Sequence, residues 1–158
     1  MNLGNYLLSM LIWLPIIGGF VVLATKTKEL HGDAARWVAL VFSGLTVALC
    51  IPLVTGFDST SSAMQFQESA EWFTVFGKHS VYYGLGVDGF SVLFILLTSF
   101  STLVIVLSSW TSIKVKVRQY MAIFLITCGL TNGVFCATDS ILYYVFWEAL
   151  LIPTCLGI

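Results

Sequence analysis

The amino-acid sequence predicts an all-α, polytopic transmembrane bundle of about five spans. Of its 158 residues, 58% are hydrophobic and only 9% are charged, whereas a soluble globular domain carries about 25% charged residues. Several apolar stretches reach about 18 residues or more, a length that crosses the hydrocarbon core of a bilayer. Water is therefore not the main solvent of this chain, and we expect residues 1–158 to form one membrane domain.

The first two apolar segments, residues 6–25 and 35–55, are each long enough to cross the membrane. The first is predicted to be a retained helix rather than a signal peptide, because residues 1–5 contain no Lys or Arg. Pro15 lies inside this segment. A proline is tolerated in a membrane helix, where it marks a bend or a close helix contact.

A polar stretch, residues 56–87, follows the second span and is long for a connection in a helical bundle. Four apolar residues recur in it at nearly helical spacing: Phe66, Ala70, Phe73 and Phe76. This spacing predicts a short amphipathic helix at the membrane interface. The end of the stretch, residues 81–87, fits an extended chain equally well.

Three further spans are predicted at residues 89–110, 120–138 and 140–158. The sequence ends in LLIPTCLGI, with no basic or polar segment after the fifth span. Such an end is unusual where a membrane helix leaves the bilayer. We therefore expect the chain to be a fragment of a longer protein and to be inactive alone.

The basic residues predict the orientation in the membrane. Six of the seven lie in two loops, between spans one and two and between spans three and four: Lys26, Lys28, Arg36, Lys114, Lys116 and Arg118. The other two loops contain the seventh, Lys78, together with most of the acidic residues. The positive-inside rule predicts that the two basic loops are cytoplasmic and that the amino terminus lies outside.

Glu148 is the only acidic side chain predicted deep inside a span. It follows Ser140 by about eight residues, or about 12 Å of helix, which is close to mid-bilayer. A carboxylate there is costly unless it is protonated, paired or hydrated, and such residues mark ion and proton paths. With a movable cation beside it, Glu148 would carry protons. The alternative is a permanently neutral acid, hydrogen-bonded to Asn132 or Thr131 of the fourth span.

The fourth span carries Gly129 and Gly133 in GxxxG spacing, which lets helices approach closely. Asn132 lies between them. We predict that its amide forms an interhelical hydrogen bond, with a place in the proton path as the alternative.

Two aspartates stand directly before predicted spans, Asp88 before the third and Asp139 before the fifth. An acidic side chain in this position caps the helix and interacts favourably with its dipole. We therefore predict capping roles for both, with ion access as the alternative for Asp88.

Several functions are disfavoured by residue usage. The four cysteines occur in apolar segments without a CxxC pair, which is typical of small buried hydrophobes rather than of a metal or redox centre: Cys50, Cys128, Cys136 and Cys155. Neither His31 nor His79 lies in a span, so paired haem ligands are missing. A net charge of -1 with dispersed basic residues also disfavours nucleic-acid binding.

Two sequence segments carry a family resemblance. The segments YGLGVDGFSVLFILLTSF, residues 83–100, and ATDSILYYVFWEALLIP, residues 137–153, resemble the third and fifth helices of subunit M of NADH-quinone oxidoreductase. This subunit of respiratory complex I corresponds to the mitochondrial fourth ND subunit. The resemblance extends in order over the whole chain and covers the amino-terminal part of the family only.

The resemblance implies an antiporter-like proton channel that couples NADH:quinone electron transfer to proton pumping. Its central glutamate matches Glu148, whereas the essential lysines of the family lie on helices beyond this chain. It also implies other complex I subunits as partners, within a bacterial cell membrane or a mitochondrial inner membrane. NADH, FMN, iron-sulfur clusters and quinone are expected in those partners. This chain has no Gly-rich nucleotide fingerprint and no cysteine cluster.

Two other functions remain open. Related subunits occur in multi-subunit cation/proton antiporters and in membrane-bound hydrogenases, where the coupled reaction differs. The chain could also be an inactive structural fragment.

Overall fold

The computed structural model describes residues 6–25, 33–75 and 79–157, which form five long helices and one antiparallel hairpin. The helices are α1 (Leu7–Ala24), α2 (Asp33–Thr55), α3 (Gly89–Ser112), α4 (Val117–Cys136) and α5 (Ser140–Gly157). Their ends lie within three residues of the five predicted spans. All five are long and apolar enough to cross a membrane, which confirms the predicted helical membrane fold.

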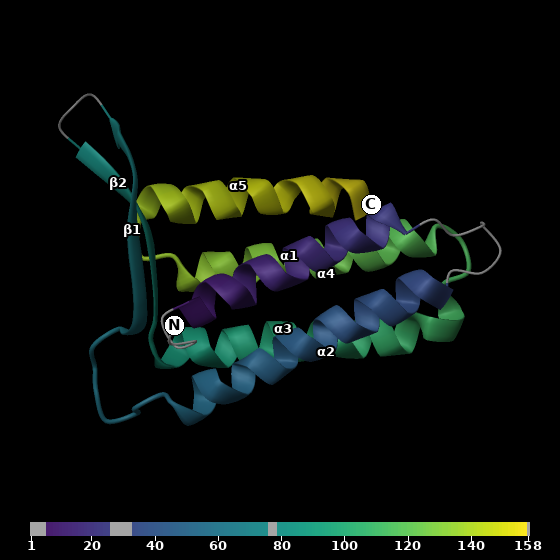
Figure 1. Cartoon of the computed structure of the whole chain (residues 1–158), viewed down its shortest axis with the longest axis horizontal. Helices are drawn as coiled ribbons and strands as arrows, with labels where there is room; N and C mark the ends of the chain where they lie inside the picture. Colours follow the sequence, from purple (N-terminus) through teal and green to yellow (C-terminus); the bar gives the residue numbers. More distant parts are fainter. Residues whose placement is uncertain (1–5, 26–32, 76–78, 158) are drawn as a thin grey trace.

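The five helices run side by side, and α4 is the central one (Figure 1). It contacts α1, α2, α3 and α5, whereas α5 contacts only α4 and β2 among the described elements. The buried apolar residues form two clusters, one near the hairpin and one towards the opposite end of the bundle. Because α5 packs on one side only, it buries the smallest share of its residues among the five helices.

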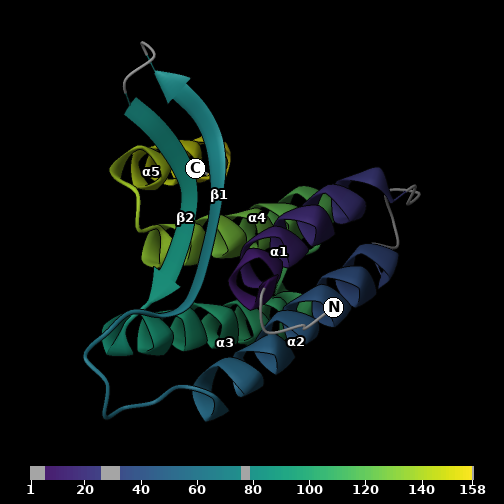
Figure 2. The same ribbon diagram turned by 60° about the vertical axis from the view of Figure 1, so that its left-hand side comes forward.

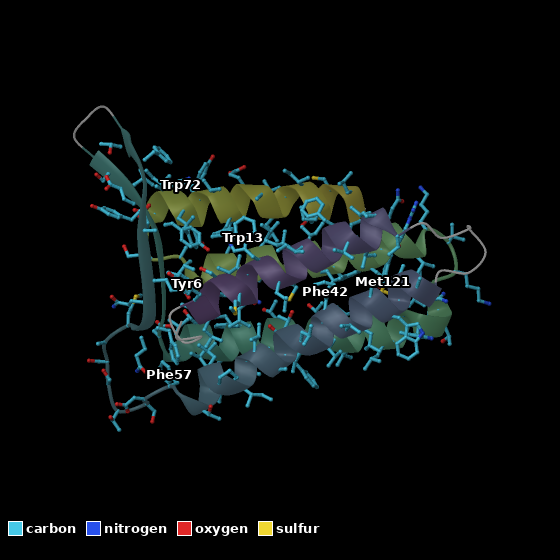
Figure 3. All side chains as sticks on the ribbon, viewed as in Figure 1. Tyr6, Trp13, Phe42, Phe57, Trp72 and Met121 are labelled. Carbon is cyan, nitrogen blue, oxygen red and sulfur yellow. The ribbon has the colours of Figure 1, made fainter. Side chains whose placement is uncertain are left out.

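Close helix contacts depend on small residues. Gly18 of α1 faces Phe42 of α2, and a Cβ atom at position 18 would lie 2.5 Å from Cγ of that ring. Figure 3 shows Phe42 lying between these two helices. Glycine therefore allows a large aromatic ring to fill the space between α1 and α2.

The hairpin consists of β1 (Gln65–Val75) and β2 (His79–Val87) and crosses the helix ends (Figure 1). Figure 2 shows it curving from the end of α3 past α4 and α5. It is joined to the α4–α5 connection, where the N–H of Thr138 donates to the carbonyl of Gly84 at 3.0 Å. The hairpin thus covers one end of the bundle and holds the segment from which α5 starts.

The predicted interface helix around Phe66, Ala70 and Phe73 is wrong, because these residues belong to β1; Phe76 lies outside the described residues. The alternative of an extended chain over residues 81–87 is confirmed. Irregular register interrupts the pairing of β1 twice, between Gln65 and Glu68 and between Glu71 and Phe73. Each irregularity shifts the side-chain alternation by which a strand is recognised. Phe66 itself has a φ of 53°, which is typical of a bulge and not of a helix.

Candidate functional site

Glu148 lies on α5 with its side chain exposed at the surface of the described chain. The residues of α5 that are buried, Leu142, Phe146 and Pro153, instead face the rest of the bundle. Exposed apolar side chains surround the carboxylate on its own face, including Leu151 and Ile152. In a membrane such a face is covered either by lipid or by another protein segment. A carboxylate is costly against lipid, so it favours cover by protein.

The position of α5 is set by its contact with α4. A Cβ atom at Gly133 would lie 2.8 Å from Cδ1 of Phe146, so the glycine lets this ring pack directly on the α4 backbone. Phe146 is 5% exposed and lies two residues before Glu148. Packing of Phe146 on α4 therefore turns Glu148 away from that helix, since the two side chains point in different directions on α5.

The first turn of α5 is capped by Asp139, as predicted. Its Oδ1 accepts the N–H of Ile141 at 2.8 Å and the N–H of Leu142 at 3.4 Å. Asp88 caps α3 in the same way and accepts the N–H of Ser91 at 2.8 Å. This hydrogen bond lowers the pKa of Asp88 below the usual value of an aspartate. Both predicted capping roles are confirmed.

Tyr144 lies one turn before Glu148 on α5, and its hydroxyl interacts with the carboxylate. Tyr143 and Trp147 stack on the same helix, with ring centroids 6.0 Å apart. Among the side chains that the structure describes, no Lys or Arg forms an ion pair with Glu148. A cation that neutralises this carboxylate must therefore come from outside the described part of the chain.

Asn132 lies inside the bundle and is 0% exposed. Its Nδ2 donates to the carbonyl of Leu11 on α1 at 3.2 Å and lies 3.4 Å from Oγ of Ser99 on α3. The predicted interhelical hydrogen bond is thus confirmed, and its partners are α1 and α3. Within the described residues, neither Asn132 nor Thr131 bonds to Glu148, so the structure does not bring these predicted site residues together.

The two glycines of the GxxxG motif serve different partners. A Cβ atom at Gly129 would lie 2.5 Å from the carbonyl oxygen of Ile12 and 3.1 Å from Cγ of Pro15, both on α1. Gly133 faces Phe146 of α5, as described above. The motif therefore brings α4 close to two helices, α1 and α5, at levels one turn apart on one face of α4.

Glu68 is a residue that the sequence analysis did not identify as important. It lies on β1 but is only 8% exposed, because its carboxylate reaches the start of α1. The N–H of Leu8 donates to Oε1 at 2.8 Å, and the hydroxyl of Ser9 donates to Oε2. One feature of the sequence indicates that such a residue is needed. The residue before α1 is Tyr6, which is not a typical capping residue and forms no capping hydrogen bond, so the cap of α1 has to come from another segment.

A cavity of about 330 Å³ lies between the hairpin and the α4–α5 connection. Its lining includes two carboxylates, Glu68 and Asp139, together with Gln67, Ser69 and Thr138. Both carboxylates already accept backbone N–H groups at helix starts, so their first role is structural. Within the described ranges, no group of three or more His, Cys, Asp or Glu side chains could hold a metal ion.

Comparison with known proteins relates the chain to respiratory membrane subunits. It is 38% identical over 149 residues to NADH-quinone oxidoreductase subunit M of Rhodobacter capsulatus, covering 93% of this chain and 28% of that protein. It is also 33% identical over 146 residues to NADH-ubiquinone oxidoreductase chain 4 of Arabidopsis thaliana, covering 92% and 28% respectively. The chain is homologous to the amino-terminal part of subunit M.

Two further comparisons extend this relationship. F(420)H(2) dehydrogenase subunit M of Methanosarcina mazei is 34% identical over 145 residues, covering 92% of this chain and 28% of that protein. A solved structure of the membrane-bound sulfane sulfur reductase, an archaeal respiratory membrane complex, contains a chain that matches with a TM-score of 0.67. That match covers 93% of this chain and 22% of the other at 19% identity, which supports the fold alone. No family model matches.

The chain spans less than a third of the length of these curated relatives. Its five helices and hairpin form a bundle that leaves the Glu148 face of α5 uncovered by any described element.

Proposed function

We propose that this chain belongs to a proton-translocating, antiporter-like subunit of NADH-quinone oxidoreductase, in which Glu148 carries the proton. One observation supports this role above the others. Glu148 is the only acidic side chain away from the helix ends in the described spans. A carboxylate is retained in such a place when it faces water or a movable cation, because either one offsets its desolvation.

The surroundings of Glu148 support a carrier rather than a structural acid. A structural acid would be enclosed by hydrogen-bond donors of the bundle, as Glu68 is at the start of α1. Glu148 instead points away from α4 with Tyr144 beside it. Pro153 adds polarity nearby, since it has no N–H to donate to the carbonyl of Ala149. A hydrated path past Glu148 would pass this carbonyl.

The partners and location follow from the same proposal. We infer that other membrane subunits of a respiratory complex cover α5, and that NADH, FMN, iron-sulfur clusters and quinone are bound by partner subunits. The membrane would be a bacterial cell membrane or a mitochondrial inner membrane, with the amino terminus outside. The relative named F(420)H(2) dehydrogenase subunit M favours a second candidate, in which the same membrane subunit serves a different electron donor.

The decisive test uses Glu148→Gln in the complete subunit within its assembled complex. Glutamine keeps the shape and hydrogen-bonding capacity of glutamic acid but cannot release a proton. We expect proton pumping in membrane vesicles, and the NADH oxidation coupled to it, to fall steeply, while Glu148→Asp keeps more of both. Glu71→Gln is the matched control, because Glu71 lies exposed on the hairpin.

Assembly of each variant is checked by native gel, so that only assembled complexes are compared. Near-normal pumping by an assembled Glu148→Gln complex would show that Glu148 is a permanently neutral acid. Proton pumping by wild-type membranes with F420H2 as the electron donor, but not with NADH, would support the second candidate.

A place for Asn132 in the proton path is tested in the same assay, where Asn132→Leu should reduce pumping.

A further inference from the structure

A cluster of small polar side chains lies in the interior between α1, α2, α3 and α4. It consists of five residues, each at most 5% exposed: Cys50, Ser99, Thr102, Cys128 and Asn132. None of the five carries a charge, and the surrounding residues of these helices are mostly apolar. Within the described residues, no hydrogen bond links this interior polar cluster to Glu148.

The orientation of the Asn132 amide is fixed by its partner on α1. Pro15 has no N–H, so the carbonyl of Leu11, four residues earlier, lacks its normal helical donor. Of the two polar atoms of the Asn132 amide, only the nitrogen can donate a hydrogen bond, and it donates to this carbonyl at 3.2 Å. The amide oxygen, Oδ1, therefore points away from the carbonyl of Leu11.

Oδ1 of Asn132 is buried and accepts no hydrogen bond from any described residue. Two neighbouring donors are used elsewhere. The hydroxyl of Thr102 donates to the carbonyl of Thr98 at 2.9 Å, and the thiol of Cys50 donates to the carbonyl of Thr46 at 3.4 Å. Buried amide oxygens in proteins are almost always paired, so this acceptor requires a donor.

The chemistry of the cluster determines which donor fits. An anion cannot donate to an amide oxygen. A cation would need a carboxylate to offset its charge inside the membrane, and no Asp or Glu belongs to the cluster. The donor must therefore be neutral.

We propose that Oδ1 of Asn132 binds one buried water molecule, held among α1, α3 and α4 by the interior polar cluster. The water donates to Oδ1, and Ser99 Oγ, which lies 3.4 Å from the amide nitrogen of Asn132, is a candidate second partner. A buried water typically forms about two to four hydrogen bonds, and Oδ1 of Asn132 together with the Ser99 hydroxyl supplies two partners for them. The site is independent of whether Glu148 carries protons.

The test is a high-resolution cryo-electron microscopy map of the complete protein in its membrane complex. We expect a solvent peak at about 2.7–3.2 Å from Oδ1 of Asn132. The proposal is overturned if that position has no peak while other interior waters are resolved nearby. It is also overturned if a side chain donates to Oδ1, or if the peak lies at shorter, metal-ligand distances.

Two variants sharpen the test. Asn132→Leu removes the acceptor, so the peak should disappear from the map. Ser43→Ala is the matched control, because Ser43 is equally buried but its hydroxyl already donates to the carbonyl of Leu40 on the same helix; its map should retain the peak. A peak that persists in Asn132→Leu overturns the proposal, and the wild-type map decides alone if this variant does not assemble.

Discussion

The carboxylate of Glu68 on β1 accepts the backbone N–H of Leu8 on α1 at 2.8 Å, although the two residues are 60 positions apart. It also accepts the N–H of Ser9 at 3.3 Å. The hydroxyl of Tyr83 on β2 lies 3.3 Å from Oγ of Ser9 and accepts the indole N–H of Trp13 at 3.1 Å. The hairpin thus supplies the cap that α1 lacks in its own sequence, and α1 in return holds the hairpin on the bundle.

We predict that Glu68→Ala destabilises the protein by about 1–3 kcal/mol, because buried N–H groups at the start of α1 lose a charged acceptor. Glu68→Gln should cost less, since its amide oxygen still accepts one N–H while the interaction of the charge with the helix dipole is lost. Thermal unfolding of the purified protein in detergent measures both changes. Glu71→Ala, on the exposed face of the same strand, is the control and should be nearly neutral. Equal effects at positions 68 and 71 would contradict the capping role.

The glycines predict opposite responses to the same substitution. Gly129→Ala places a Cβ atom 2.5 Å from the carbonyl oxygen of Ile12, which is backbone and can move only if α1 and α4 separate. We expect a loss of about 1–3 kcal/mol in the free energy of unfolding, as for other overpacked interiors. Gly44→Ala on α2 is the matched control, because a Cβ atom there meets nothing within 4 Å. It should be neutral or stabilising by up to about 1 kcal/mol. Equal stability of the two variants in thermal unfolding would rule out the close α1–α4 contact.

Gly133→Ala should act on function through the position of α5. The added Cβ atom meets the ring of Phe146 at 2.8 Å, and a side chain can shift where backbone cannot. We therefore expect a smaller loss of stability than for Gly129→Ala, together with displacement of the helix that carries Glu148. Proton pumping by the assembled complex should fall more than its stability does. If pumping instead falls in proportion to the loss of stability in both Gly129→Ala and Gly133→Ala, the α4–α5 contact has no special role in placing Glu148.

The cap of α3 predicts a dependence of stability on pH. Because the hydrogen bonds from Ser91 lower the pKa of Asp88 in the folded protein, the charged form contributes stability above the unfolded pKa of about 3.9. This contribution is lost as the pH falls through the lower, folded pKa. Asp88→Asn keeps a capping oxygen without a titratable group, so its stability should approach that of the wild type at acid pH. Asp88→Ala should lose about 1 kcal/mol at neutral pH. A constant difference between wild type and Asp88→Asn over the acid range would contradict the role of the charge.

The features predicted from the sequence are those that depend on neighbouring residues along the chain. The five spans are recognisable because each is a continuous apolar segment of membrane length. Asp88 and Asp139 are recognisable because a cap acts on the helix that directly follows it. The interhelical bond of Asn132 is predictable from the cost of an unpaired amide in lipid, although its partner, Leu11, is not.

The features missed depend on contacts between distant segments or on irregular geometry. The two register shifts of β1 disturb the period of two that identifies a strand, so its apolar residues predict a helix instead. Glu68 lies in that strand, and its partners Leu8 and Ser9 belong to another element, so no local pattern identifies their contact. The location of Glu148 on an outer face also depends on Gly133 and Phe146 packing together, which a single helix cannot reveal. Its role as the proton carrier remains a prediction.

The last prediction concerns which end of the bundle faces the cytoplasm. The α3–α4 connection, with Lys114, lies at the end of the bundle opposite to the hairpin (Figure 1). The positive-inside rule places the basic α3–α4 end in the cytoplasm and the hairpin outside. Ser62 and Lys114 are both exposed and suit cysteine labelling; in contrast, Arg118 donates to the carbonyl of Thr25 and Glu68 is buried, so replacing either would disturb the fold.

In a background without the native cysteines, Ser62→Cys should react with an impermeant thiol reagent added outside. Lys114→Cys should react only after the cytoplasmic face is opened, for example in inverted vesicles. Reaction of both positions from one face would contradict the arrangement of the five helices, because α3 connects the two ends. Reaction of each from the opposite face to that expected would leave the helix arrangement intact and show that the positive charge at the α3–α4 end does not set the orientation. The two failures are therefore distinguishable, because the first concerns the arrangement of the helices and the second the orientation of the bundle in the membrane.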